Sequence, residues 1–142
     1  MVFTLDRSSA FQARVYDQLQ HDPIVWLTTV SPNGQPQPSP VWFMWDGADK
    51  IIIYTKPDRP KVRNIKANPK VAIHFDSLAR GEMIAIFTGP IEISDHYPAV
   101  NELPGYAEKY HSLFVQLGTD ADQMAAEYTT TLVFTMEALR GY

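Results

Sequence analysis

The sequence of 142 residues contains no cysteine, so disulfide bonds, thiolate nucleophiles and cysteine-ligated zinc sites are excluded. It also lacks an apolar run long enough to span a membrane, and its first residues do not follow the pattern of a signal peptide. These absences predict a cytoplasmic protein that needs no membrane. A hydrophobic content of 45% is enough for one core, and we expect a single domain over residues 1–142.

Basic residues are scarce in the chain as a whole but dense in one segment. There are 12 Lys and Arg against 16 Asp and Glu, a balance that argues against a general binder of nucleic acid or of membrane surfaces. Between positions 54 and 70 the only acid is Asp58, and this segment contains half of all the basic residues: Lys56, Arg59, Lys61, Arg63, Lys66 and Lys70. We infer that this charge has a small, local target.

Several segments have the apolar spacing of amphipathic helices. Residues 6–20 place Phe11, Val15 and Leu19 on one stripe, with an Asp or a Ser available as the N-terminal cap. Residues 98–117 repeat apolar and aromatic positions, and Pro104-Gly105 is expected to break them into two short helices. A further short helix is predicted over about 120–127.

Segments rich in β-branched and aromatic residues predict six strands, over 24–30, 35–45, 50–55, 71–76, 82–95 and 129–139. Asn33-Gly34 predicts a tight turn after the first strand, and Gly89-Pro90 predicts a bulge or bend inside the fifth. The pattern favours a mainly β fold with peripheral α-helices, a small closed or partly closed antiparallel barrel, because closure removes exposed sheet edges. A mixed α+β sandwich is the alternative.

Prolines occupy alternate positions of the second predicted strand, at Pro36, Pro38 and Pro40. The N–H groups of alternate strand residues point to the same side, so three consecutive donors toward one neighbour are missing. That side cannot be a normally paired edge. It either protects the sheet against aggregation or borders a ligand or a second subunit, with Trp42 and Phe43 nearby, and the two interpretations are compatible.

The basic segment contains a predicted helix of about two turns, with Asp58 as a possible cap and Pro69 just after its end. A helix N-terminus carries positive partial charge, so Arg59, Lys61 and Arg63 are unfavourable there. A bound anion would reverse the sign of these interactions, because phosphate binds well to a helix N-terminus reinforced by Lys and Arg. We therefore prefer a phosphate site to the alternative of basic side chains that are merely solvated.

The segments SPVWFMWDG and IIIYTKPDRPKVRNIKANPKVAIHF resemble the pyridoxamine 5'-phosphate oxidase-like split-barrel flavoproteins, and most of all their F-420-dependent (deazaflavin) oxidoreductase branch. The resemblance extends over nearly the whole chain, including LTTVSPNGQP and TTTLVFTMEALRGY. It implies a six-stranded antiparallel split β-barrel of the FMN-binding type. It also implies a homodimer that binds F-420 or FMN in a groove between subunits and transfers hydride to or from a small organic substrate.

The resemblance further implies which residues contact the cofactor. The strand over residues 39–44 would lie along the ring system, and the segment that begins at Tyr54 would hold the phosphate, with Arg59 and Lys66 also available for the acidic tail of F-420. Where true pyridoxamine 5'-phosphate oxidases combine Arg, Ser and Lys in their phosphate loops, this chain has Lys56, Arg59 and Pro60, which disfavours the vitamin B6 reaction. The expected contacts are Ser39, Pro40, Val41, Trp42, Phe43, Tyr54, Thr55, Lys56, Arg59, Lys61 and Asn64.

Other functions stay open at this point. One is a flavin or deazaflavin carrier or storage module without turnover, and another is an FMN enzyme related to pyridoxamine 5'-phosphate oxidase. A barrel that binds single-stranded nucleic acid through Tyr54 and the basic run is physically coherent, but the acidic total weighs against it.

No residue of the sequence is assigned a catalytic role, since hydride transfer by a bound cofactor needs no protein nucleophile. Tyr106, Tyr110 and His111 could line a substrate pocket or donate a proton, although aromatic residues at helical spacing more often belong to a core. The four histidines show no metal-ligand spacing, and we predict no metal site.

Overall fold

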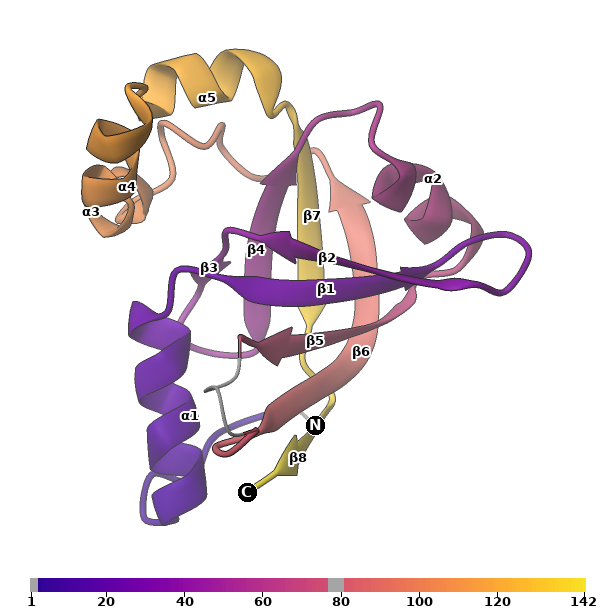
Figure 1. Cartoon of the computed structure of the whole chain (residues 1–142), viewed down its shortest axis with the longest axis vertical. Helices are drawn as coiled ribbons and strands as arrows, with labels where there is room; N and C mark the ends of the chain where they lie inside the picture. The colour runs from indigo at the N-terminus through magenta and orange to yellow at the C-terminus, as the bar shows by residue number, and fades with distance from the viewer. Residues whose placement is uncertain (1–2, 77–80) are drawn as a thin grey trace.

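The computed structural model describes residues 3–76 and 81–142, which form a curled antiparallel sheet flanked by helices (Figure 1). Within these residues the sheet has eight strands in the order β2-β1-β5-β6-β7-β4-β3, with β8 beside β6. The strands are β1 (Val25–Val30), β2 (Pro36–Val41), β3 (Met44–Trp45), β4 (Lys50–Thr55), β5 (Lys70–Phe75), β6 (Ala85–Ser94), β7 (Thr130–Thr135) and β8 (Ala138–Gly141). The helices are α1 (Ala10–His21), α2 (Pro60–Ala67), α3 (Tyr106–Lys109), α4 (His111–Leu117) and α5 (Ala121–Glu127).

The mainly β, curled antiparallel architecture agrees with the sequence, but the count of six strands is wrong. The predicted second strand is divided into β2 and β3, because between them the N–H of Phe43 donates to the hydroxyl of Tyr110 at 2.8 Å instead of to a strand. The predicted last strand is likewise divided into β7 and β8, which pair with different parts of β6. Both divisions come from contacts between residues that are distant in the sequence.

Strand β6 passes through both halves of the sheet. Its first part pairs with β5 and β8, and its second part pairs with β7. Figure 1 shows β6 curving from one half to the other, and the predicted bend at Gly89-Pro90 lies at the end of the first part, where both residues still pair with β5. A Cβ atom at Gly89 would overlap the carbonyl oxygen of Thr135, so the close approach of β6 to the end of β7 requires glycine.

Strand β4 is a wall shared by two hydrophobic clusters, because successive strand residues point to opposite faces. Ile51 and Ile53 belong to the main core, which fills the curled sheet against α1. Ile52 and Tyr54 belong to a second cluster, which packs against the segment that contains α3, α4 and α5. Strand β4 pairs with β7 on one side, in a register that joins Lys50 to Thr135, and with the short β3 on the other.

The helices follow the sequence except at their ends. The stripe of α1 is confirmed, with Val15 and Leu19 buried, and Ser9 caps the helix by accepting a hydrogen bond from the N–H of Gln12. Helix α2 ends before Pro69 as predicted, but its N-cap is Arg59 and no described side chain caps it, so the predicted cap at Asp58 is wrong.

The expected helical segment 98–117 is only partly helical. Its first part, 98–105, forms turns, and the two short helices are separated at Tyr110 instead of at Pro104-Gly105. None of the helices in residues 3–76 and 81–142 is long and apolar enough to cross a membrane.

Candidate functional site

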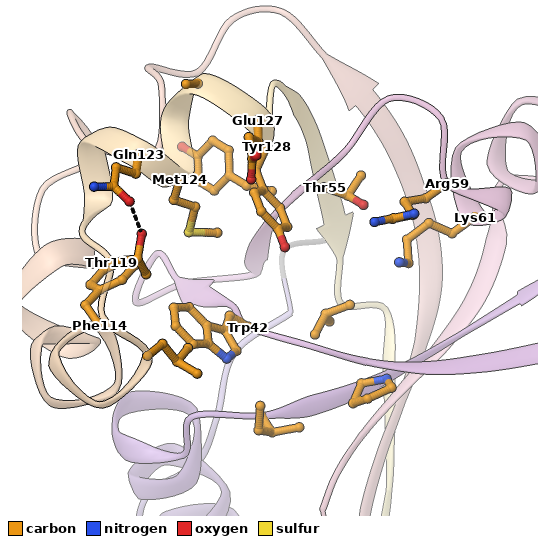
Figure 2. Close-up of a pocket in the computed structure, with 16 residues that line it drawn as sticks. Trp42, Thr55, Arg59, Lys61, Phe114, Thr119, Gln123, Met124, Glu127 and Tyr128 are labelled. Carbon is orange, nitrogen blue, oxygen red and sulfur yellow. Dashed lines mark hydrogen bonds between the residues drawn. The ribbon is translucent and has the colours of Figure 1, made fainter.

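A cavity of about 830 Å³ lies between the end of β2, the end of β4, the start of α2 and the helices α4 and α5 (Figure 2). Its size is typical of a site for a cofactor or a drug-sized ligand. The lining residues are Ile24, Pro40, Val41, Trp42, Tyr54, Thr55, Arg59, Lys61, Phe114, Leu117, Thr119, Gln123, Met124, Ala126, Glu127 and Tyr128.

One end of the cavity is cationic. Strand β4 ends at the buried Thr55, and after a short turn the first residues of α2 bring Arg59 and Lys61 to the same place. Figure 2 shows the Arg59 and Lys61 side chains directed toward the cavity from the side of α2. Burial lowers the pKa of the Lys61 ammonium, and the neighbouring Arg59 lowers it further. An anion between these two side chains would oppose both effects, because it stabilises the charged form of the lysine.

Lys56 lies next to this end but outside the lining. Its Nζ is 3.9 Å from Glu127 Oε2 and 5.4 Å from the centroid of the Tyr128 ring. These contacts connect the end of β4 with the end of α5. Because Glu127 is exposed, the ion pair contributes little to stability, and its effect is to direct Lys56 toward α5.

The other end of the cavity is aromatic and apolar. The indole of Trp42 stacks on the ring of Tyr110 with 4.3 Å between centroids and 1° between planes, and Phe114 meets it edge-on at 5.3 Å. Leu117 and Met124, from α4 and α5, complete this wall. The arrangement suits a flat, apolar group, which would replace water against these side chains.

The alternate prolines of β2 face the open side of the sheet. Within the described residues β2 pairs only with β1, where Pro36, Pro38 and Pro40 lie opposite Val30, Thr28 and Trp26. Since proline has no N–H, the bonds to β1 come from the residues between the prolines. The outer edge therefore offers carbonyl acceptors and no donor, and its Pro40 end lines the cavity. Within the described residues no strand pairs with that side of β2, and its contact with a ligand or a second subunit stays a prediction.

The structure brings many of the expected contact residues together in this cavity: Pro40, Val41, Trp42, Tyr54, Thr55, Arg59 and Lys61. Four others lie outside the lining: Ser39, Phe43, Lys56 and Asn64. The Phe43 side chain is fully buried in the main core. Ser39 lies within β2, opposite Leu27.

Asn64 is fully buried between α2 and the sheet. Its Nδ2 donates to Thr29 Oγ1 at 3.0 Å and to Gln37 Oε1 at 2.7 Å, which ties α2 to β1 and β2. Its Oδ1 has no hydrogen-bond partner among the described residues. The geometry thus gives Asn64 a supporting position beneath the cationic helix.

Sequence reasoning missed the wall made by α4 and α5. Phe114 and Leu117 lie three positions apart on α4, and Met124 lies on α5. Such apolar positions also fit a core, and only the fold shows that they face a cavity. Conversely, Tyr106 and Tyr110 are fully buried in the second cluster and His111 is exposed, so none of the three lines the cavity. In residues 3–76 and 81–142, no three His, Cys, Asp or Glu side chains are grouped to hold a metal ion.

Comparison with known proteins gives one family and several similar structures. A family model described as pyridoxamine 5'-phosphate oxidase matches residues 11–141. No curated protein matches the chain significantly. Among solved structures, an F-420 reductase is 25% identical with a TM-score of 0.61, and the alignment covers 87% of this chain and 94% of that one.

Two further structures show the same fold at lower identity. The heme storage protein HutZ from Vibrio cholerae is 14% identical with a TM-score of 0.65, over 94% of this chain and 95% of that one. A conserved hypothetical protein from Mycobacterium tuberculosis is 22% identical with a TM-score of 0.69, over 90% of this chain and 81% of that one. At these identities the likeness concerns the fold alone.

Proposed function

The chain belongs to the pyridoxamine 5'-phosphate oxidase family, and from that membership we propose that it is an oxidoreductase that transfers hydride between bound F-420 or FMN and a small organic substrate. The observation that carries the proposal is the two-ended cavity, with Arg59 and Lys61 at one end and Trp42 at the other. A phosphorylated cofactor with a flat ring system is complementary to this cavity, because its phosphate is anionic and its ring is flat and largely apolar.

The cationic end fits a phosphate group. Arg59 and Lys61 supply charged donors, and the Thr55 hydroxyl lies in the same lining. The first turn of α2 contains no acid and is not capped by any described side chain. Pro60 has no N–H and the N–H of Val62 donates to the carbonyl oxygen of Arg59, so among the first three residues of the helix the N–H of Lys61 is the one available to an anion. Glu127 also lines the cavity, but its carboxylate faces Lys56.

The apolar end fits the ring system. Pro40, Val41 and Trp42 form one wall from the edge strand, while Phe114 and Met124 face it from the helices and exclude water. Bound there, F-420 or FMN would supply the centre that exchanges hydride. The residues of the chain would bind the phosphate, orient the ring and keep the reacting side dry.

A second candidate is a carrier or storage protein that binds the same cofactor without turnover. The observation in its favour is that Pro40, Val41, Trp42, Phe114, Leu117 and Met124 carry no acidic group, and that Tyr54, a phenol that packs beside them, already donates its proton to the carbonyl oxygen of Pro98. An FMN enzyme related to pyridoxamine 5'-phosphate oxidase would use the same site. For every version we propose a cytoplasmic homodimer with the cofactor between subunits, a feature that rests on family membership.

The proposal is tested by titrating the protein with FMN and with F-420 and following absorbance and fluorescence. The wild type is expected to bind at least one of them. Lys61→Ala is expected to weaken binding about tenfold to a hundredfold, because it removes a charged donor to the phosphate. The control is Lys70→Ala, an exposed lysine of β5 outside the cavity, which should bind like the wild type.

Equal affinity of Lys61→Ala and the wild type for both cofactors would contradict the phosphate site. Turnover is tested separately, by mixing the protein and reduced cofactor with enones or quinones. Oxidation of the cofactor faster than in protein-free solution supports the enzyme, while tight binding without any acceleration supports the carrier.

A further inference from the structure

Tyr110 contacts the backbone next to the cavity from a position that is itself fully buried. It lies at the junction of α3 and α4, and its hydroxyl oxygen accepts a hydrogen bond from the N–H of Phe43 at 2.8 Å. The same hydroxyl lies 2.9 Å from the carbonyl oxygen of Phe43 and 2.8 Å from that of Pro23. Its single proton is therefore shared between two acceptors.

These contacts replace a missing strand partner. Phe43 is in the gap between β2 and β3, and its side chain is fully buried in the main core. A buried backbone N–H or C=O without a partner lowers the stability of the fold. The segment between β2 and β3 therefore needs hydrogen bonds from residues outside the sheet. Lys109 supplies a further one, because its Nζ donates to the carbonyl oxygen of Phe43 at 2.9 Å and lies 3.6 Å from the centre of the Phe43 ring.

The same tyrosine also fixes the residue before Phe43. The Trp42 indole lies parallel to the Tyr110 ring at 4.3 Å, so one of its faces is covered. Trp42 nevertheless lines the cavity, and only its uncovered surface can meet a ligand. Tyr110 thus controls both the backbone that carries Trp42 and the plane of its ring, although it does not itself line the cavity.

We propose that Tyr110 is a positioning residue for cofactor binding, which acts by holding Trp42 in the orientation that the ring of the cofactor needs. This inference rests on the proposed function. A wall that is already ordered loses less conformational freedom when a ligand binds, so loosening Trp42 should lower affinity without removing any contact to the phosphate. The matched comparison is Tyr106, which is equally buried and whose hydroxyl has no hydrogen-bond partner among the described residues.

The experiment compares Tyr110→Phe with Tyr106→Phe in the background Trp26→Phe, Trp45→Phe, where Trp42 is the only tryptophan. Without ligand, Tyr110→Phe is expected to shift the Trp42 emission to longer wavelength and to lower its anisotropy, while Tyr106→Phe leaves both unchanged. With ligand, Tyr110→Phe is expected to bind the cofactor about tenfold more weakly, and Tyr106→Phe to bind it like the background protein.

The outcomes separate two failures. If neither FMN nor F-420 binds the wild type, the proposed function fails and this inference fails with it. If the wild type binds but Tyr110→Phe has unchanged emission, or a shifted emission with unchanged affinity, only this inference is overturned. If Tyr110→Phe does not fold, Lys109→Met is used instead, because it removes the other side-chain contact to the Phe43 carbonyl. The emission of Trp42 and the affinity for the cofactor are then measured in the same way.

Discussion

Gly89 is a residue whose missing side chain shapes the sheet. It lies where β6 passes from one half of the sheet to the other, and an added Cβ would overlap the carbonyl oxygen of Thr135. We expect Gly89→Ala to lower the free energy of unfolding by at least about 2 kcal/mol, because the opposing atom is backbone and cannot move aside by rotation. Urea unfolding followed by circular dichroism measures this change.

The neighbouring substitution Thr88→Ala is the control. Thr88 is exposed, and the change leaves its backbone pairing with Ala72 and Ala138 in place. It should alter the free energy of unfolding by less than about 0.5 kcal/mol. If Gly89→Ala unfolds at the same urea concentration as Thr88→Ala, the close contact between β6 and the end of β7 is wrong.

At the scale of residues, the sequence predicts the charge of the site better than its geometry. The excess of basic residues in 54–70 is local and can be read directly, and Arg59 and Lys61 do line the cavity. Lys56 belongs to the same run but is directed toward Glu127, a residue of α5 far along the chain. Asn64 follows Lys61 by three positions, yet it is buried beneath the helix because Thr29 and Gln37 hold its amide.

At the scale of elements, α5 shows how a cap positions a wall of the cavity. Asp120 accepts a hydrogen bond from the N–H of Gln123 at 2.8 Å, and α5 carries Gln123 and Met124 into the lining. Asp120→Ala is expected to lower the free energy of unfolding by about 1 kcal/mol, the usual effect of losing such a cap. Thermal and urea unfolding both report it.

Asp58→Ala is the matched comparison for that prediction. Asp58 precedes α2 in the sequence as Asp120 precedes α5, but the N-cap of α2 is Arg59 and no described side chain caps the helix. Asp58→Ala should therefore change stability by less than about 0.5 kcal/mol. A larger loss for Asp58→Ala than for Asp120→Ala would show that α2 begins differently.

The features of helices and strands that could be predicted are those determined by residues within the same segment. The unpaired side of β2 follows from the missing N–H groups of Pro36, Pro38 and Pro40, which any fold must respect. The break between β2 and β3 depends instead on Tyr110, which is 67 positions away from Phe43. No pattern within the segment 35–45 contains that contact, so the sequence predicts one strand where the structure has two.

At the scale of the whole molecule, burial of ionisable groups predicts how stability changes in alkaline solution. Burial lowers the pKa of Lys109 to about 8, against an effect of Asp22 in the other direction. Between about pH 8 and 10 the unfolded chain then binds more protons at this site than the native protein. The free energy of unfolding should rise over this range, as the native lysine loses its charge.

Above about pH 10 the tyrosines reverse the trend. Burial raises the pKa of Tyr54 to about 12, with Tyr97 adding to the effect, and burial also raises the pKa of Tyr106 and Tyr110. The unfolded state then releases protons that the native state keeps, so stability should fall. Urea midpoints measured from pH 7.5 to 11 should pass through a maximum. Lys109→Met should reduce the rising part, to which Lys61 still contributes because burial lowers its pKa as well. A curve that falls steadily from pH 8 would contradict the burial of Lys109.

The register that pairs β4 with β7 joins Thr55 to Thr130, and it has a consequence for the order in which the molecule assembles. Contacts between such distant positions form late, because the loop between them loses its freedom before any pairing compensates. One wall of the cavity precedes this loop, and α4 and α5 lie within it. The cavity therefore exists only once this long-range pairing is made. A ligand of this site would bind the folded chain and not the unfolded one, so the appearance of ligand binding during refolding would report when β4 and β7 have paired.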